Sequence, residues 1–511
     1  MGVPQEIRDV ERPKNTIVQE NRSSKGVIYS VRKRDGYFID DKGNPCPINS
    51  SVIGHIVNGK YVPILEEDNK LPEKLSFGAE YFIQSVANDI YDDLLQSFDY
   101  KDAPSILVTA MLRVIEPGIA SSRLASEYST SYLSAYYPGV ALSKNHISDL
   151  IEDIGRNSRK MTKFFQLRLE RVEKEHHILI DGTLVQDNST VNDLSAFSHK
   201  FRMKGVKDIS VIYAYDAELK EPICAQVFPG NMLDASAFPK FIEQNNLTKG
   251  ILVADKGFPI TQIEKYLKET ERQDMHFISP IRRNDSRIAT NNMYDDWEGF
   301  LKNTDKAIKY KKEKIQVNRW LYSFKDVQRA EEEEEIFNKK YKRNNKVPTK
   351  ADMEKCGKES GTITFVSDLD LTPEEVYSTY DNRWELETVF KTFKQDLCIT
   401  KTDVQNNFSV EGTQFINFIS ALLTCRLINK IKKAELFETY SFNGLMKVLS
   451  KMWRKVIIED GLIKPAPEPK GNDKYWAVYF KYIYDLMEKL ELFPKKPKNK
   501  TKKKAEITKK N

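Results

Sequence analysis

The chain has 511 residues, 40% of them hydrophobic, and a formal net charge of +6. It is too long for one ordinary domain and apolar enough for substantial cores, so several domains are expected. No apolar run of about 18 residues and no charged-then-apolar leader is present, which argues against membrane spanning or secretion. Five cysteines lie scattered without a Cys-x-x-Cys pair, which argues against zinc or disulfide frameworks and fits a reducing cytoplasm.

Residues 1–170 are predicted to form an N-terminal α+β region. The turn residues in GVIYSVRKRDGYFIDDKGNPCPI indicate a small β-hairpin over residues 26–48. Residues 103–115 and 143–157 have the pattern of helices, and Ser143 is a suitable N-cap for the second.

Two aspartates each follow a short apolar run of the kind that forms a buried strand ending in a turn. Asp181 follows Ile178–Ile180, and Asp255 follows Ile251–Ala254. Carboxylates held there are costly to desolvate and need basic groups or a divalent cation as counter-charge. Hard oxygen ligands favour Mg²⁺ or Mn²⁺. Alternatively, Asp181 is a turn residue and Asp255 a helix N-cap.

The segments around these aspartates predict an α/β order. Strands are expected at 208–215 and 221–228 and a helix at 233–244, all before Asp255; a helix at 259–270 and a strand at 275–279 follow it. This β-β-β-α-β-α-β order, followed after an interruption by a helix, matches a ribonuclease-H-like fold. In that fold, acids on the first strand, the fourth strand and a late helix converge on two metal ions.

The interruption, residues 281–361, is too long for a structureless loop and is predicted to be an inserted β-rich subdomain. Residues 306–326 have the pattern of two basic strands, and 331–346 that of an exposed charged helix. This segment contains Trp297 and Trp320, and a strand tryptophan such as Trp320 more often serves packing.

One helical face over residues 380–394 carries an acid, cations and a phenol. At about 100° per residue, Tyr380, Arg383, Lys391 and Lys394 all lie within roughly 60° of Glu387. Such a face suits a metal-binding carboxylate beside a phosphodiester. The alternative is a solvated helix face with ordinary ion pairs.

The C-terminal part is predicted to contain packing helices and a charged tail. Helices are expected at 415–428 and 443–457. Residues 495–511 hold nine lysines against one glutamate, so residues 1–494 carry a net charge of −2. Any DNA-binding groove therefore needs local segregation of charge, and the tail is expected to be disordered.

The motifs together resemble a known family. The spacing Tyr-x2-Arg-x3-Glu-x6-Lys, with IDGT, ADKGF and PGNMLDASAF, is similar to the DDE transposases of bacterial insertion sequences, in the group with a Tyr-Arg-Glu-Lys signature. The resemblance spans roughly residues 176–430. It implies a ribonuclease-H-like core, a mixed sheet flanked by helices. The expected domains are 1–170 (transposon-end binding), 171–280 and 362–435 (catalytic core), 281–361 (insertion), 436–494 (helical region) and 495–511 (tail).

The resemblance implies cut-and-paste DNA transposition by metal-dependent cleavage and strand transfer. Asp181, Asp255 and Glu387 would bind two Mg²⁺ or Mn²⁺ ions. The expected partners are double-stranded DNA, as terminal inverted repeats and target, and a second copy of the chain; no membrane is expected. The expected location is the bacterial cytoplasm, with the nucleoid when on DNA. The residues implied to contact DNA are Tyr380, Arg383, Trp384, Lys391, Lys394, Lys256 and Trp320.

Two other functions compete with transposition. The string hydrophobic-Asp-Gly-Thr also occurs in haloacid-dehalogenase-type phosphatases, but these need a nucleophilic aspartate where this chain has Leu179. That function is therefore excluded. A catalytically inactive, transposase-derived DNA-binding protein stays an alternative, against which the intact Asp181, Asp255 and Glu387 set argues.

Overall fold

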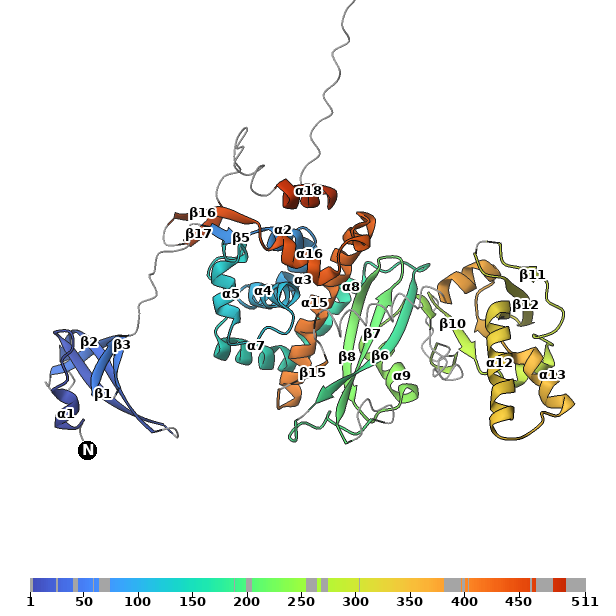
Figure 1. Ribbon diagram of the computed structural model, residues 1–511, viewed down its shortest axis with the longest axis horizontal. Helices are drawn as coiled ribbons and strands as arrows, with labels where there is room; N and C mark the ends of the chain where they lie inside the picture. Colours follow the sequence, from blue (N-terminus) through green and yellow to red (C-terminus); the bar gives the residue numbers. More distant parts are fainter. Residues whose placement is uncertain are drawn as a thin grey trace, which may run out of the picture. The chain divides into compact units, whose positions relative to one another are not determined.

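The structure is a computed structural model that contains two compact units (Figure 1). One unit comprises residues 1–72 and the other residues 73–511. The structure describes residues 3–23, 26–39, 45–57, 59–63, 74–187, 189–198, 205–253, 264–267, 274–302, 304–380, 397, 400–402, 404–459, 462–465 and 481–492.

The first unit is a small antiparallel sheet. Its elements are α1 (Gln5–Arg8), β1 (Thr16–Ser23), β2 (Gly26–Ile39), β3 (Pro45–Val57) and β4 (Lys60–Pro63). The strands pair in chain order. The predicted hairpin is confirmed, because β2 pairs with β3 from Tyr29–Ile56 to Ile39–Pro45. The flanking strands β1 and β4 were not predicted.

The second unit begins with a strand and a layer of helices. These are β5 (Lys74–Ser76), α2 (Gly78–Gln84), α3 (Asn88–Ser97), α4 (Asp102–Ile115), α5 (Leu124–Thr130), α6 (Leu133–Tyr136), α7 (Lys144–Arg156) and α8 (Ser158–Leu169). The helices predicted at 103–115 and 143–157 are confirmed as α4 and α7. The Ser143 hydroxyl accepts a hydrogen bond from the His146 amide at 3.3 Å, as an N-cap does.

A long helix, α15 (Asn407–Lys433), crosses α7 at very close range. Glycines make this approach possible. A Cβ at Gly155 would lie 1.9 Å from the carbonyl oxygen of Phe408, and one at Gly412 would lie 1.9 Å from that of Ile151. Any larger residue at either glycine would push the two backbones apart.

The centre of the second unit is one mixed sheet. It contains β6 (His177–Asp187), β7 (Asp208–Asp216), β8 (Glu221–Pro229), β9 (Gly250–Val253), β10 (Met275–Ile281), β11 (Gly299–Phe300), β12 (Ile308–Gln316), β13 (Arg319–Asp326), β14 (Thr362–Ser367) and β15 (Lys401–Thr402). The main path runs β11-β12-β13-β14-β10-β9-β6-β7-β8, with β15 beside β6. Strands β6, β7 and β8 are antiparallel neighbours, whereas β9 is parallel to both β6 and β10.

The predicted α/β order is confirmed where the structure describes it. Strands β7, β8 and β10 and helix α9 (Asp234–Gln244) match their predicted ranges to within two residues. Strand β9 covers Gly250–Val253, and Ala254 lies outside the described residues. Of the helix predicted at 259–270, only 264–267 are described, and they are helical.

One prediction about β6 was wrong. The sequence indicated a short strand that ends at Asp181 and turns at Gly182, but β6 continues to Asp187. Its ladder with β7 is unbroken from Ile178–Asp216 to Gln186–Asp208, so the backbone of β6 stays extended and paired with β7 through Asp181 and Gly182. Gly182 is an ordinary strand residue, and Asp181 lies within β6, not at its end.

The predicted insertion is not a separate sheet. The two basic strands appear as β12 and β13, and the charged helix as α12 (Val327–Arg343); α11 (Ser286–Thr290) and α13 (Lys350–Glu359) complete this part. However, β13 pairs with β14, and β14 pairs with β10. The hairpin therefore extends the central sheet through continuous backbone hydrogen bonds.

The C-terminal part contains strands that the sequence did not predict. After α15 come η1 (Leu436–Glu438), α16 (Phe442–Leu449), β16 (Trp453–Glu459), β17 (Leu462–Pro465) and α18 (Lys481–Lys489). The helix predicted at 443–457 was wrong beyond Leu449. Residues 456–458 are Val-Ile-Ile, which favour a strand, and β16 finds partners in β17 and in β5.

Buried charges join the helical layer to the outer strand β8. The Arg168 side chain, 1% exposed, donates to Asp89, Asp93 and Glu221. Arg426 of α15 also donates to Asp89 and, at 2.6 Å, to Glu221. Burial would raise the pKa of Asp89, but hydrogen bonds and charge from Arg426 outweigh burial and hold this pKa well below its usual range.

Within the described ranges, no helix has both the length and the apolar character needed to cross a lipid bilayer.

Candidate active site

Asp181 is the only one of the three predicted acids that the structure describes; Asp255 and Glu387 lie outside the described residues. It is partly buried, and its Oδ1 accepts a hydrogen bond from the Gly182 amide at 2.8 Å. Directly across the ladder is Tyr213, whose ring stacks on Phe418 of α15 with centroids 6.3 Å apart. Because residues paired across a ladder share a face, Asp181 belongs to the sheet face that α15 covers.

The parallel neighbour of β6 leads toward the second predicted acid. Leu179 of β6 lies beside Val253, the last described residue of β9. In the sequence, Asp181 comes two residues after Leu179, and Asp255 comes two residues after Val253. The two acids thus occupy equivalent positions along the sequence of adjacent parallel strands. Lys256, predicted to contact DNA, also lies outside the described residues.

Of the helical segment predicted at 380–394, only Tyr380 is described, and it is the last described residue of a helix over residues 373–380. A capping box starts it. The Glu375 amide donates to the Thr372 hydroxyl at 3.2 Å, and the Thr372 amide donates to the Glu375 carboxylate at 2.7 Å. The sequence Thr-Pro-Glu-Glu at 372–375 is a recognisable helix start that the sequence analysis missed.

Tyr380, the last described residue of this helix, packs on the same sheet face as Asp181. Its ring lies 5.0 Å from that of Phe365 in β14, centroid to centroid. The strand register relates Phe365 to Asp181. Phe365 of β14 pairs with Pro280 of β10, and Ile278, two residues from Pro280, pairs with Val253 of β9. Val253 in turn pairs with Leu179 of β6, two residues before Asp181. Alternate residues of a strand return to the same face, so Phe365 and Asp181 share it.

The remaining predicted contacts with DNA divide into two groups. Trp320 is described and is 8% exposed, packed in an apolar cluster with Tyr322, Phe324 and Phe365. The Lys314 ammonium lies over its ring at 5.3 Å. This is the packing arrangement expected of a strand tryptophan. Trp297, by contrast, is partly exposed. The other predicted contacts, which lie outside the described residues, are Arg383, Trp384, Lys391 and Lys394.

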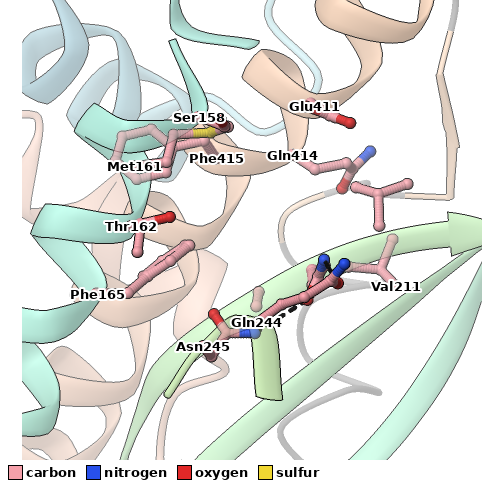
Figure 2. Close-up of a pocket in the computed structure, with 13 residues that line it drawn as sticks. Ser158, Met161, Thr162, Phe165, Val211, Gln244, Asn245, Glu411, Gln414 and Phe415 are labelled. Atoms are coloured by element: carbon pink, nitrogen blue, oxygen red, sulfur yellow. Dashed lines mark hydrogen bonds between the residues drawn. The ribbon is translucent and has the colours of Figure 1, made fainter. Parts of the chain in front are cut away.

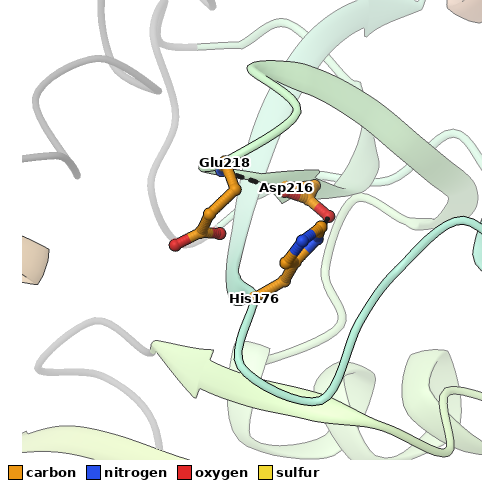
Figure 3. Close-up of side chains that lie close together, drawn as sticks. All are labelled: His176, Asp216 and Glu218. Atoms are coloured by element: carbon orange, nitrogen blue, oxygen red, sulfur yellow. Dashed lines mark hydrogen bonds and ion pairs between the residues drawn. The ribbon is translucent and has the colours of Figure 1, made fainter.

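A second group of metal-ligand type lies where β6 begins and β7 ends (Figure 3). One ligand atom each from His176, Asp216 and Glu218 falls within 4.8 Å of the others. Asp216 pairs with Ile178, three residues along the ladder from the pair of Asp181 and Tyr213. At about 3.3 Å per residue, the group is about 10 Å from Asp181 along the strand. It includes none of the predicted metal ligands.

The acids of this second group already have partners. Asp216 binds His176 Nδ1 at 2.6 Å, and it accepts the amides of Glu218 and Leu219 at 2.9 and 2.8 Å. Glu218 accepts both the amide and Nδ1 of His177, each at 2.7 Å. These bonds fix the turn after β7 against the start of β6, so a structural role accounts for the group.

The pKa values of Asp216 and Glu218 are shifted in opposite directions. Burial raises the pKa of Asp216 despite its hydrogen bonds. Burial would also raise the pKa of Glu218, but its hydrogen bonds from His177 outweigh burial and lower it. Glu218 is therefore held in its charged form.

Residues 173–423 match the family model of the transposase DDE domain. This match supports a DDE transposase. The matched range contains Asp181, Asp255 and Glu387, and it also spans the whole predicted insertion. The resemblance to DDE transposases is confirmed at this level, and the more specific Tyr-Arg-Glu-Lys group stays a prediction.

The other comparisons add little. No curated protein matches the chain. A solved structure described as a cryo-EM structure of a piggyBac transposase synaptic complex with hairpin DNA is similar at a TM-score of 0.38 and 10% sequence identity, covering 85% of this chain and 88% of that chain. A likeness this weak does not establish a common fold.

Proposed function

We propose that the chain is a DDE transposase of the Tyr-Arg-Glu-Lys group that cleaves DNA at transposon ends and joins them to target DNA. The register between β6 and β9 is the observation that carries this proposal. Leu179 lies beside Val253, and each is followed two residues later by an acid. If the pairing continues for two residues, Asp181 and Asp255 stand side by side on one sheet face.

The third acid fits the same face. Tyr380 packs on Phe365 at the end of a helix that a capping box starts. Glu387 comes seven residues later, about two helical turns, so a helix continued from 373–380 presents both side chains in the same direction. Asp181, Asp255 and Glu387 then form the catalytic set.

Three carboxylates make an all-oxygen donor set, which suits Mg²⁺ or Mn²⁺. Two such ions, when bound, supply positive charge to the attacking and leaving oxygens of an in-line displacement. The protein's part is to hold the carboxylates in place. Asp181 is suited to this, because the unbroken β6–β7 ladder fixes its backbone and the Gly182 amide orients its side chain.

The strand order supports a ribonuclease-H-like core. Three antiparallel strands, β8-β7-β6, are followed by the parallel strands β9 and β10, the arrangement that the sequence order predicted. In this proposal, residues 171–280 and 362–435 form the core, 281–361 form a β-rich insertion on its edge, and part of 1–170 recognises transposon ends.

DNA is the substrate in this proposal, with two copies of the chain joining two transposon ends in a bacterial cell. Arg383 is suited to bidentate phosphate contacts, and Lys391, Lys394 and Lys256 to single ones. Tyr380 contacts a phosphate through its hydroxyl while its ring stays on Phe365. Trp384 is proposed to stack on an unpaired base. Trp320 contributes by supporting the β12–β13 hairpin that approaches DNA.

The test is excision in cells of a marker flanked by the DNA that borders the gene. Wild type is compared with Glu387→Gln and with Glu374→Gln, a matched change earlier in the same segment. Excision by wild type and Glu374→Gln, but not by Glu387→Gln, supports the proposal. Excision by Glu387→Gln would remove that residue from the catalytic set.

The alternative function is an inactive, transposase-derived DNA-binding protein. It predicts that wild type binds the bordering DNA but neither cleaves nor excises it with Mg²⁺ or Mn²⁺. An electrophoretic shift measured beside a cleavage assay separates the two functions.

A further inference from the structure

A cavity of about 350 Å³ lies between the helical layer and the outer strands of the sheet (Figure 2). Helices α8 and α15 form one side of it and strands β7 and β8 the other. The end of α9 reaches it around β8 through Gln244 and Asn245. Its volume falls in the lower part of the range of about 300–1,000 Å³ for small-ligand sites.

The lining excludes an anionic ligand. Among the described residues that line the cavity there is no lysine, arginine or histidine, and Glu411 is the one ionisable side chain of that described set. Burial raises the pKa of Glu411, which favours its neutral form. A phosphate or carboxylate would find no counter-charge here, so an uncharged occupant is favoured.

The lining also points to an occupant with hydrogen-bonding edges. Four amides face or flank the cavity, together with the hydroxyls of Ser158 and Thr162. Three of the amides, Gln226, Gln244 and Asn245, are hydrogen-bonded in a chain. The fourth, Gln414, is 4% exposed, and its Nε2 is buried without a hydrogen-bond partner. Figure 2 shows this amide directed into the space between α15 and β7.

An unsatisfied buried donor costs stability, and an acceptor on a ligand would recover that loss. The Oε1 atom of Gln414 accepts from Asn417 at 3.4 Å, which leaves Nε2 as the unpartnered donor of this cavity-lining amide. The apolar walls come from Met161, Phe165 and Phe415. A flat, uncharged ring with acceptors and donors on its edge matches this lining, and amides are the side chains that read such edges.

The cavity is on the same sheet face as Asp181. Tyr213, the partner of Asp181, pairs with Ala225 of β8, which lines the cavity. Val211 and Val227, which pair with each other two residues further on, line it as well. Directly paired and alternate residues share a face, so the cavity opens beside the strand that carries Asp181.

We propose that this cavity is a nucleobase-binding site in which the Gln414 amide donates to a base carbonyl or ring nitrogen. The base is either that of a free nucleoside or an unpaired base of DNA held near Asp181. The second source rests on the proposed transposase function, and the first does not.

The test measures binding of four nucleosides to the full chain by isothermal titration calorimetry. A parallel arm measures fluorescence with two duplexes that carry 2-aminopurine, one unpaired and one fully paired. Wild type is compared with Gln414→Leu, which removes the donor at similar volume, and with Thr162→Val. The matched control is Gln166→Leu, because Gln166 is exposed on α8 and outside the lining.

We expect Gln414→Leu to weaken binding about ten-fold and Thr162→Val less, with Gln166→Leu unchanged. Nucleoside binding with this pattern assigns the site to free nucleosides. A preference for the unpaired duplex that Gln414→Leu removes assigns it to DNA. Absence of both overturns the proposal and leaves a water-filled cavity. Neither arm needs strand cleavage, so a failure here and a failure of excision are separate results.

Discussion

Two places along the β6–β7 pair carry acids in contrasting situations. Where β6 begins and β7 ends, Asp216 and Glu218 are bonded to His176 and His177 and to backbone amides of the turn. Further along β6, Asp181 lies inside a continuous ladder, bonded to the Gly182 amide, with a second acid following the neighbouring parallel strand in sequence. Proximity of metal-ligand residue types thus selects the first place, whereas strand register selects the proposed catalytic acids at the second.

This contrast predicts unequal effects of mutation at the two places. Asp181→Asn should lower excision about 10³-fold or more, because a lost metal ligand removes several kcal/mol of transition-state stabilisation. His176→Gln, about 10 Å away along the strand, should leave excision within about two-fold of wild type. The measurement is excision frequency at matched protein levels. Equal losses from both variants would mean that the two places act as one site.

The buried charge network between the helices and β8 is expected to serve stability and not catalysis. Arg168→Met should lower the free energy of unfolding by about 3–5 kcal/mol, because it leaves Asp93 and Glu221 buried with one cation fewer. Arg123→Met, at an exposed pair with Glu116, should leave the urea midpoint nearly unchanged. Equal midpoints for both variants would show that the network adds no stability.

The smallest expected effect is a change in the stability of the protein at acidic pH. The folded pKa of Glu218 lies below its ordinary 4.5, so its contribution is present above pH 4.5 and is lost as pH falls through the folded value. Asp216 has a folded pKa above its ordinary 3.8, so its ionisation opposes folding and protonation relieves that cost.

Because the two pKa shifts have opposite signs, removing each carboxyl should change the pH dependence of stability in opposite directions. Glu218→Gln should flatten the loss of stability on acidification, and Asp216→Asn should steepen it. Urea midpoints measured from about pH 6 to about pH 3 check this. Parallel curves for wild type and both variants would contradict the assignment of these carboxyls as a pH-sensitive structural pair.

Local sequence patterns predicted much of the sheet. Strands β7, β8 and β10 are β-branched or apolar runs with clear ends, and Ser143 marks a helix start by its own chemistry. The predicted end of β6 failed because Gly182 signals a turn locally, while pairing with β7 satisfies an extended backbone there. Pairing between distant segments is not encoded in a local pattern.

The same reason explains what was missed around the site. The cavity is assembled from segments at 158–165, 211–227, 244–245 and 411–415, and no single segment has an unusual composition. Tyr380 was found because its spacing from Glu387 is helical, yet its contact with Phe365 depends on where β14 enters the sheet. The arginines of the buried network lie on helices whose partners are only apparent in three dimensions.

Strand β14 has a mechanical consequence for the predicted insertion. It is hydrogen-bonded to β13 on one side and to β10 on the other, and it leads within five residues to Thr372, where the helix bearing Tyr380 begins. A load on the β12–β13 hairpin is therefore carried by a ladder of backbone bonds, not by a loose tether. Displacing the hairpin would therefore strain the same strand that leads into the Tyr380 helix.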